Sequence, residues 1–300
     1  MNPFLIHLGS GAAFFSGAGL IVFGVALASL ARNRWMLAGA DIVAVCGVVL
    51  VSLSSTPIAP WFVWAWMLAT VVALVIAHRH TLLRTRAIAA AVVLVLGLSG
   101  AAAEAPHQFT PDAPVVNAPR LYVVGDSISS GVGRENGPTW VRLIDQQKGV
   151  EVVDLSRPGA TLSSALATVR RVPLKDGLVL LEIGGNDMFR HAPEDQFERD
   201  LKALLDHVSG PGRTVVMLEL PLLPFHAEIG RIQRRLAAER GVMLIPKRHF
   251  ASCLRGRGST IDGLHLSDMG HRNMANMIWA AVGSSLSTQP PARQTRSGRA

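Results

Sequence analysis

Residues 121–129 have the sequence LYVVGDSIS, in which a short apolar run ends at a glycine, an aspartate and a serine. An uninterrupted apolar run is typical of a strand that is buried on both faces of a parallel sheet. Similar runs follow at residues 151–155, 178–183, 214–218 and 242–245. Amphipathic stretches alternate with them and predict helices at about residues 138–147, 161–170, 196–208, 227–239 and 270–285. This alternation predicts an α/β fold with helices on both faces of a parallel sheet.

Polar clusters follow several of these strands. GDS at residues 125–127 ends the first strand, PGAT at 158–161 follows the second, and GGND at 184–187 ends the third. DGLH at residues 262–265 lies in the loop before the last predicted helix. Ligands of such sheets bind at the carboxyl ends of the strands, so we expect these clusters to lie at one edge.

Their residue types fit acyl transfer. A serine hydroxyl is a weak nucleophile that needs an adjacent base, and histidine serves when a carboxylate fixes its tautomer. Ser127, His265 and Asp262 supply these three groups. The oxyanion of the tetrahedral intermediate needs fixed donors, which the backbone N–H groups of Ser127 and Gly159 and the amide of Asn186 could supply.

Each motif alone is more typical of an ordinary turn, but their order and positions together resemble the SGNH (GDSL-type) hydrolases. The resemblance covers about residues 119–285 and is weaker for the lysophospholipase/arylesterase branch. It implies a three-layer flavodoxin-like sandwich, with catalytic Ser127, Asp262 and His265 and an oxyanion hole at Ser127, Gly159 and Asn186. One departure is DLS at residues 154–156, where the family more often has an Asn-containing turn.

The chain before this region contains four apolar runs, at about residues 10–31, 36–54, 61–77 and 87–103. Each is close to the roughly 20 residues that cross a bilayer core. The arginines of this region fall at residues 31–35 and 78–86, and arginine-bearing loops stay cytoplasmic. We therefore expect a protein of the bacterial inner membrane, with its catalytic domain on the periplasmic, extracytoplasmic side.

The predicted organisation has four parts. Residues 1–103 form a four-helix transmembrane region, and residues 104–119, rich in proline, form a linker that holds the next domain off the membrane. Residues 120–286 form the hydrolase domain, and residues 287–300 form a disordered basic tail.

Composition excludes several other classes. The net charge of +8 comes from loop and tail arginines, so the hydrolase region is near neutral and nucleic-acid binding is not expected. Two distant cysteines form neither a disulfide framework nor a zinc motif. Neither a Walker A loop nor a dinucleotide fingerprint occurs, so no metal and no cofactor are expected. The sequence does not determine the oligomeric state.

The predicted function is hydrolysis of carboxylic esters, either acetyl or acyl esters or lysolipids. One alternative is an O-acyltransferase that acts on a cell-envelope glycan, for which Asp41 inside the second apolar run would matter. The alternative to a functional role is that Asp41 is an interfacial charge that snorkels or pairs with Arg34. A further alternative is a non-catalytic domain that binds glycan or protein, and the complete set of catalytic residues argues against it.

Overall fold

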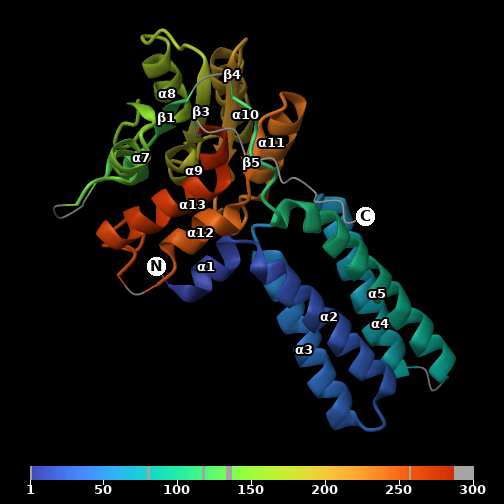
Figure 1. Ribbon diagram of the computed structural model, residues 1–300. Coiled ribbons are helices and arrows are strands. Elements are labelled where there is room, and N and C mark those ends of the chain that lie inside the picture. Colours follow the sequence, from blue (N-terminus) through green and yellow to red (C-terminus); the bar gives the residue numbers. More distant parts are fainter. Residues whose placement is uncertain (1, 80–81, 117–118, 133–136, 257, 287–300) are drawn as a thin grey trace, which may run out of the picture.

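The computed structural model describes residues 2–79, 82–116, 119–132, 137–256 and 258–286. A bundle of long helices extends from one side of an α/β domain (Figure 1). The predicted tail at 287–300 lies outside the described residues. The helices of the N-terminal region are α1 Pro3–Gly9, α2 Ala12–Leu30, α3 Arg34–Leu53, α4 Pro60–Arg79 and α5 Leu83–Glu104, followed by the 3-10 turn η1 Ala105–Gln108.

The α/β domain has a five-stranded sheet in the order β2-β1-β3-β4-β5, with every neighbouring pair parallel. This is the flavodoxin-like strand order, and the predicted fold class is confirmed. The strands are β1 Arg120–Gly125, β2 Glu151–Asp154, β3 Gly177–Glu182, β4 Arg213–Leu218 and β5 Met243–Ile245. The helices are α6 Ser127–Ser130, α7 Trp140–Lys148, α8 Leu162–Val169, α9 Gly185–Phe189, α10 Glu194–Val208, α11 Ala227–Glu239, α12 Lys247–Leu254 and α13 Asp268–Leu286.

Alternating side chains of the strands divide the core into two apolar layers. Tyr122 and Val124 of β1 pack with α8, α10 and α11 on one face of the sheet. Leu121 and Val123 of the same strand pack with α7, α12 and α13 on the other face. Both faces are therefore covered, which explains why the central strands consist of almost continuous apolar residues.

Glycines let α2 and α3 approach closely in the helical bundle. A Cβ atom added to Gly17 would lie 2.7 Å from the carbonyl oxygen of Gly47, and one added to Gly47 would lie 2.6 Å from the backbone nitrogen of Ile21. Small residues at such contacts are typical of helices that associate within a membrane. A larger residue at either glycine would push the two helices apart.

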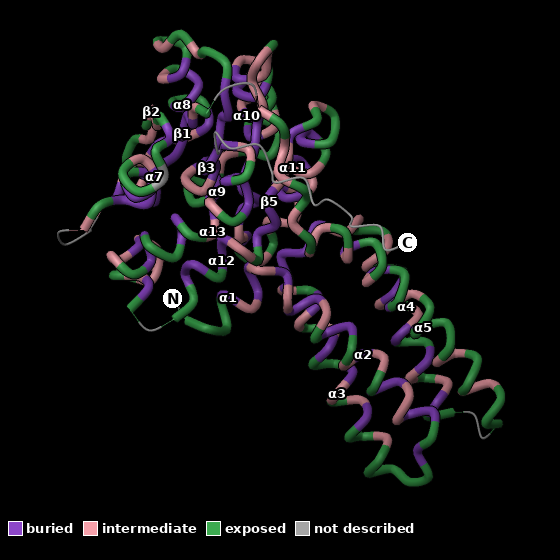
Figure 2. The backbone as a smooth tube through the Cα atoms, in the orientation of Figure 1, coloured by how far each residue is buried: buried purple, intermediate pink, exposed green. Residues whose placement is uncertain are grey.

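The outward faces of the bundle are apolar. Helices α2–α5 are long and apolar enough to cross a membrane, and their exposed sides are visible along the bundle in Figure 2. The exposed large side chains there include Phe23, Leu30, Trp35, Ile42, Trp61, Trp64, Leu68, Val95 and Leu98. Soluble proteins rarely expose continuous apolar patches of more than a few hundred Å². Trp35 lies at one end of the bundle and Trp61 and Trp64 at the other, as in the aromatic belts of membrane proteins.

The proline-rich segment differs from the expected spacer. Glu104, at the end of α5, is buried and forms an ion pair with Arg234 of α11 at 2.7 Å. Further along, Thr110 Oγ1 lies 2.8 Å from His249 Nε2, and the carbonyl of Val115 accepts a hydrogen bond from Thr214. Residues 104–115 therefore lie against the α/β domain, because two side chains and a backbone carbonyl of this stretch find partners there.

Candidate active site

Ser127 and Asn186 follow two neighbouring strands of the sheet. Ser127 comes after β1 and Asn186 after β3, and β1 has β2 on its other side. The strand order reverses between β1 and β3, and ligands of open α/β sheets bind in the crevice at such a reversal. The fold thus brings the two predicted residues to the edge where a ligand is expected.

Ser127 is held at the start of α6 by its neighbours. Asp126 is buried, and its Oδ1 accepts a hydrogen bond from the backbone nitrogen of Ile128 at 2.9 Å. The carbonyl of Ser127 accepts hydrogen bonds from Gly131 and Val132, both at 3.1 Å. These hydrogen bonds fix the backbone of the half-buried serine, and none of them uses its hydroxyl, which can therefore bind a base.

His265 joins Ser127 to Asp262. Its Nε2 lies 3.1 Å from Ser127 Oγ, and its Nδ1 lies 2.6 Å from Asp262 Oδ2. A carboxylate only accepts hydrogen bonds, so Nδ1 carries the proton and Nε2 is left to accept the serine proton. Asp262 Oδ1 also accepts from the backbone nitrogens of Leu264 and His265. The hydrogen bonds from the His265 side chain and from these nitrogens hold the Asp262 pKa well below its usual range, so Asp262 stays charged.

Of the other predicted oxyanion residues, Asn186 lies in α9 and Gly159 lies in the loop between β2 and α8. Asn186 Nδ2 donates to the carbonyl of Ala160 at 3.0 Å and to Asp126 Oδ2 at 3.2 Å. Gly159 has a φ of +69°, a conformation that favours glycine, and its carbonyl accepts from Arg190 at 3.3 Å. Asn186 and Ser127 line the pocket described below, whereas Gly159 is not among its lining residues.

Asp187 of α9 connects this helix to the start of α8. Its carboxylate accepts from the backbone nitrogen of Leu162, the first residue of α8, at 3.1 and 3.3 Å. Leu162 follows Gly159 closely in the chain, so this contact holds the loop after β2 against α9 and Asn186. Burial raises the pKa of Asp187 to about 6.

Glu182 is a buried acid of the site that sequence reasoning missed. Its Oε2 accepts a hydrogen bond from Ser129 Oγ of α6 at 2.6 Å, and this bond holds α6 against β3. Burial raises the pKa of Glu182 well above its usual value, and the nearby Asp126 carboxylate raises it further. A lone carboxylate in the otherwise apolar run at residues 178–183 was the available signal, because a buried charge has a high cost unless it has a partner.

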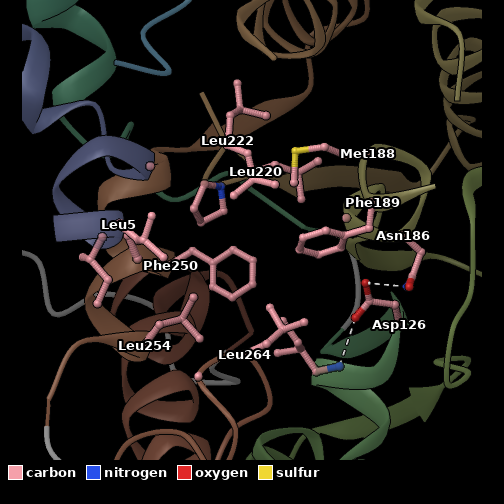
Figure 3. Close-up of a pocket in the computed structure, with 18 of the residues that line it drawn as sticks. Leu5, Asp126, Asn186, Met188, Phe189, Leu220, Leu222, Phe250, Leu254 and Leu264 are labelled. Atoms are coloured by element: carbon pink, nitrogen blue, oxygen red, sulfur yellow. Dashed lines mark hydrogen bonds between the residues drawn. The ribbon is translucent and has the colours of Figure 1, made fainter. Parts of the chain in front are cut away.

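An apolar cavity of about 440 Å³ opens beside these groups. Ser127, Asn186 and Asp262 line one side, and leucines, Met188 and two phenylalanines form much of the rest. In Figure 3, Leu5, Phe250 and Leu254 lie on the side opposite Asp126 and Asn186. Leu5 belongs to α1, and Phe250 and Leu254 belong to α12, two helices that the sequence did not predict. Within the described residues, no group of three or more His, Cys, Asp or Glu side chains is arranged to hold a metal ion.

Comparison with known proteins gives consistent matches. Residues 123–272 match the GDSL-like Lipase/Acylhydrolase family. Esterase TesA of Pseudomonas aeruginosa is 29% identical over 182 residues, which cover 55% of this chain and 88% of the relative. Thioesterase 1/protease 1/lysophospholipase L1 of Escherichia coli K12 is 28% identical over 160 residues, 49% of this chain and 76% of the relative. A crystal structure of TesA aligns with a TM-score of 0.48 at 27% identity. The alignment covers 54% of this chain and 97% of the TesA chain.

The family match spans half of the chain and includes all the predicted site residues, from Ser127 to His265. The N-terminal helices lie outside it. The chain therefore belongs to the GDSL-like Lipase/Acylhydrolase family and is a hydrolase of the SGNH type that acts on ester bonds.

Proposed function

We propose that this protein is a membrane-anchored serine esterase that hydrolyses acyl esters or lysolipids outside the cytoplasm. The observation that carries the proposal is the pair of hydrogen bonds that joins Ser127 Oγ to His265 and His265 to Asp262. Its catalytic domain comprises residues 120–286, and residues 1–103 anchor it. The names of the relatives, esterase and lysophospholipase, support the same class of substrate.

The first half of the reaction transfers the acyl group to Ser127. His265 Nε2 takes the proton from Ser127 Oγ as the oxygen attacks the ester carbonyl carbon. The carbonyl π electrons move to the oxygen and form an oxyanion. When the tetrahedral intermediate collapses, the bond to the alcohol oxygen breaks, and the alcohol leaves with the proton from His265. Asp262, charged throughout, stabilises the imidazolium that forms between the two steps.

The second half releases the acid. Water gives a proton to His265 Nε2 and attacks the acyl-enzyme, and Ser127 leaves with that proton. The backbone nitrogens of Ser127 and Gly159 and Asn186 Nδ2 donate to the oxyanion in both halves. Without substrate, the Asn186 amide donates to Ala160 and Asp126. A substrate oxyanion would therefore compete with these two acceptors for the amide.

A fluorophosphonate probe tests the nucleophile directly. The full chain in detergent is expected to hydrolyse p-nitrophenyl esters and to lose this activity when the probe bonds to Ser127. Mass spectrometry of the digested protein should find the added mass on the peptide that contains Ser127. Labelling of another serine, or full activity after stoichiometric labelling of Ser127, would contradict the proposal.

The arginines of the bundle support an extracytoplasmic catalytic domain. Arg32 and Arg34 lie between α2 and α3, and Arg79, Arg84 and Arg86 flank the connection from α4 to α5. Arg86 donates to the carbonyl of Ala31 at 3.2 Å, so both connections lie at one end of the bundle. That end is remote from the α/β domain (Figure 1). Arginine-rich connections stay in the cytoplasm, so the α/β domain belongs on the other side.

Reporter fusions in a bacterial host test this orientation. Alkaline phosphatase fused at the C-terminus is expected to be active, and green fluorescent protein at the same point is expected to be dark. Fusions that replace the chain after residue 33, in the first arginine-bearing connection, serve as the control and should behave in the opposite way. A fluorescent, phosphatase-negative C-terminal fusion would reverse the proposed topology.

Acyl transfer to a glycan loses the support that Asp41 offered. Asp41 Oδ2 lies 2.8 Å from Nε2 of His78, near the end of α4, so its partner is His78 rather than Arg34. This pair lies toward the arginine-bearing end of the bundle, away from Ser127. An acidic group there is too remote to take part in chemistry at the serine.

A further inference from the structure

Helix α1 lines the same cavity as the reactive serine. Leu5, Ile6 and Gly9 of α1 border the cavity, together with Ser127 and Asn186. Ile6 is buried, whereas Leu5 is 45% exposed and therefore lies both at the cavity and at the surface. Figure 3 shows Leu5 close to Phe250 and Leu254. The cavity is therefore built from two parts of the chain that lie far apart in sequence.

Buried hydrogen bonds fix α1 in this position. The hydroxyl of Ser55, which lies between α3 and α4, donates to the carbonyls of Leu8 and Gly9 at 2.9 and 3.1 Å. The carbonyl of Ser55 in turn accepts from Nζ of Lys247, the first residue of α12, at 2.8 Å. Both Ser55 and Lys247 are at most 1% exposed. Burial lowers the pKa of Lys247 to about 8, because its charged form loses its water shell there.

The end of α1 also packs against another wall of the cavity. A Cβ atom on Gly9 would lie 3.2 Å from the carbonyl oxygen of Leu222, so little room is left between them. Leu222 and Leu223 line the cavity too, and Leu223 is partly exposed. Leu5 and Leu223 therefore give the cavity an apolar, solvent-exposed rim. Only Ser10 and Gly11 separate α1 from α2, which is long and apolar enough to cross a membrane.

We propose that α1 forms the outer wall of the acyl pocket and makes the enzyme selective for esters with one long acyl chain, which enters from the membrane surface. The inference rests on the proposed esterase function and names its substrate class. The volume of the cavity is typical of sites that enclose a whole small molecule. An acetyl group would leave most of this apolar space without a partner, whereas each methylene of a longer chain gains by leaving water.

The substitution Leu5→Trp tests the wall. The full chain in detergent is assayed with p-nitrophenyl acetate, butyrate, octanoate and dodecanoate, and kcat/KM is measured for each. The wild-type protein is expected to prefer the longer esters. The indole would fill space beside Phe250 and Leu254, so the ratio of dodecanoate to acetate kcat/KM should fall roughly tenfold or more.

Phe4→Trp is the matched control, because Phe4 is the adjacent residue of α1, is 51% exposed and does not line the cavity. This variant should keep the wild-type ratio. If Leu5→Trp also keeps it while turnover still depends on Ser127, α1 is not the wall and the inference fails, although the esterase function stands. A fall of equal size in both variants would likewise overturn the inference, since it would reflect the membrane contact of α1 and not the cavity.

A photocrosslinking experiment tests the pocket without turnover. Full-length Ser127→Ala protein in detergent is irradiated with a lysophospholipid whose acyl tail carries a diazirine, and the labelled peptides are sequenced. Labels within residues 2–9 and 250–254 are expected, and Leu5→Trp should reduce them while Phe4→Trp should not. Labels confined to the outward faces of α2–α5 would overturn the inference, whether or not the protein hydrolyses esters.

Discussion

Replacement of Ser127 by alanine is expected to lower kcat for ester hydrolysis by on the order of a million-fold. The variant lacks the only oxygen within hydrogen-bond distance of His265 Nε2 among the described residues, so the acyl-enzyme cannot form. Binding and the oxyanion donors remain, and they leave a small activity above that of water alone. Turnover of a p-nitrophenyl ester by the full chain, at matched protein concentration, measures the loss.

Ser130→Ala is the control for this experiment. Ser130 ends the same short helix, and its buried hydroxyl has no hydrogen-bond partner within the described residues. Its removal is expected to leave turnover close to that of the wild-type protein. If Ser127→Ala kept more than a small fraction of the activity, another nucleophile would be responsible and the assigned triad would be wrong.

Arg234→Met is expected to destabilise the folded protein by about 3–5 kcal/mol, the usual effect of removing one partner from a buried ion pair. Arg234 donates to both oxygens of Glu104 and, through Nε, to Glu219 at 2.7 Å. Both glutamates are 1% exposed. Loss of the guanidinium would leave two carboxylates buried between α5 and the α/β domain without that partner. The midpoint of thermal unfolding of the full chain in detergent should fall clearly.

The adjacent arginine provides a matched comparison. Arg235 also forms ion pairs, with Glu198 and Glu239, but these lie at the surface, where screening makes such pairs weak. Arg235→Met is therefore expected to change the unfolding midpoint little. Equal midpoints for the two variants would mean that the buried cluster does not hold the α/β domain on the bundle.

The sheet and the positions of the candidate catalytic residues could be predicted because their signals are local. Each buried strand is a continuous apolar run, and the polar blocks at Ser127 and Asn186 directly follow such runs. Parallel topology then brings strand ends to one edge, whatever the loops between them do. The pairing of His265 with Asp262 is local as well, since the two residues lie three positions apart.

The acyl pocket could not be predicted in the same way. Its walls meet through contacts between distant segments, such as Leu5 with α12 and Ser55 with Lys247. The sequence KRHFASCL of α12 has two basic residues in its first turn and was not recognised as a helix. Lys247 and Glu219 look like ordinary surface charges in sequence, because burial depends on what later packs over them. The pairing of Asp41 with His78 in place of Arg34 has the same origin, since it joins two helices.

Two helices that line the same side of the pocket, α1 and α12, are made at different times during synthesis. Helix α1 leaves the ribosome long before α12, so this side of the cavity cannot form until the α/β domain has folded. The hydrogen bond from Lys247 to the carbonyl of Ser55 can form only then, and Ser55 in turn holds the end of α1. We therefore expect the enzyme to gain its full activity on long-chain esters only after the two regions have assembled.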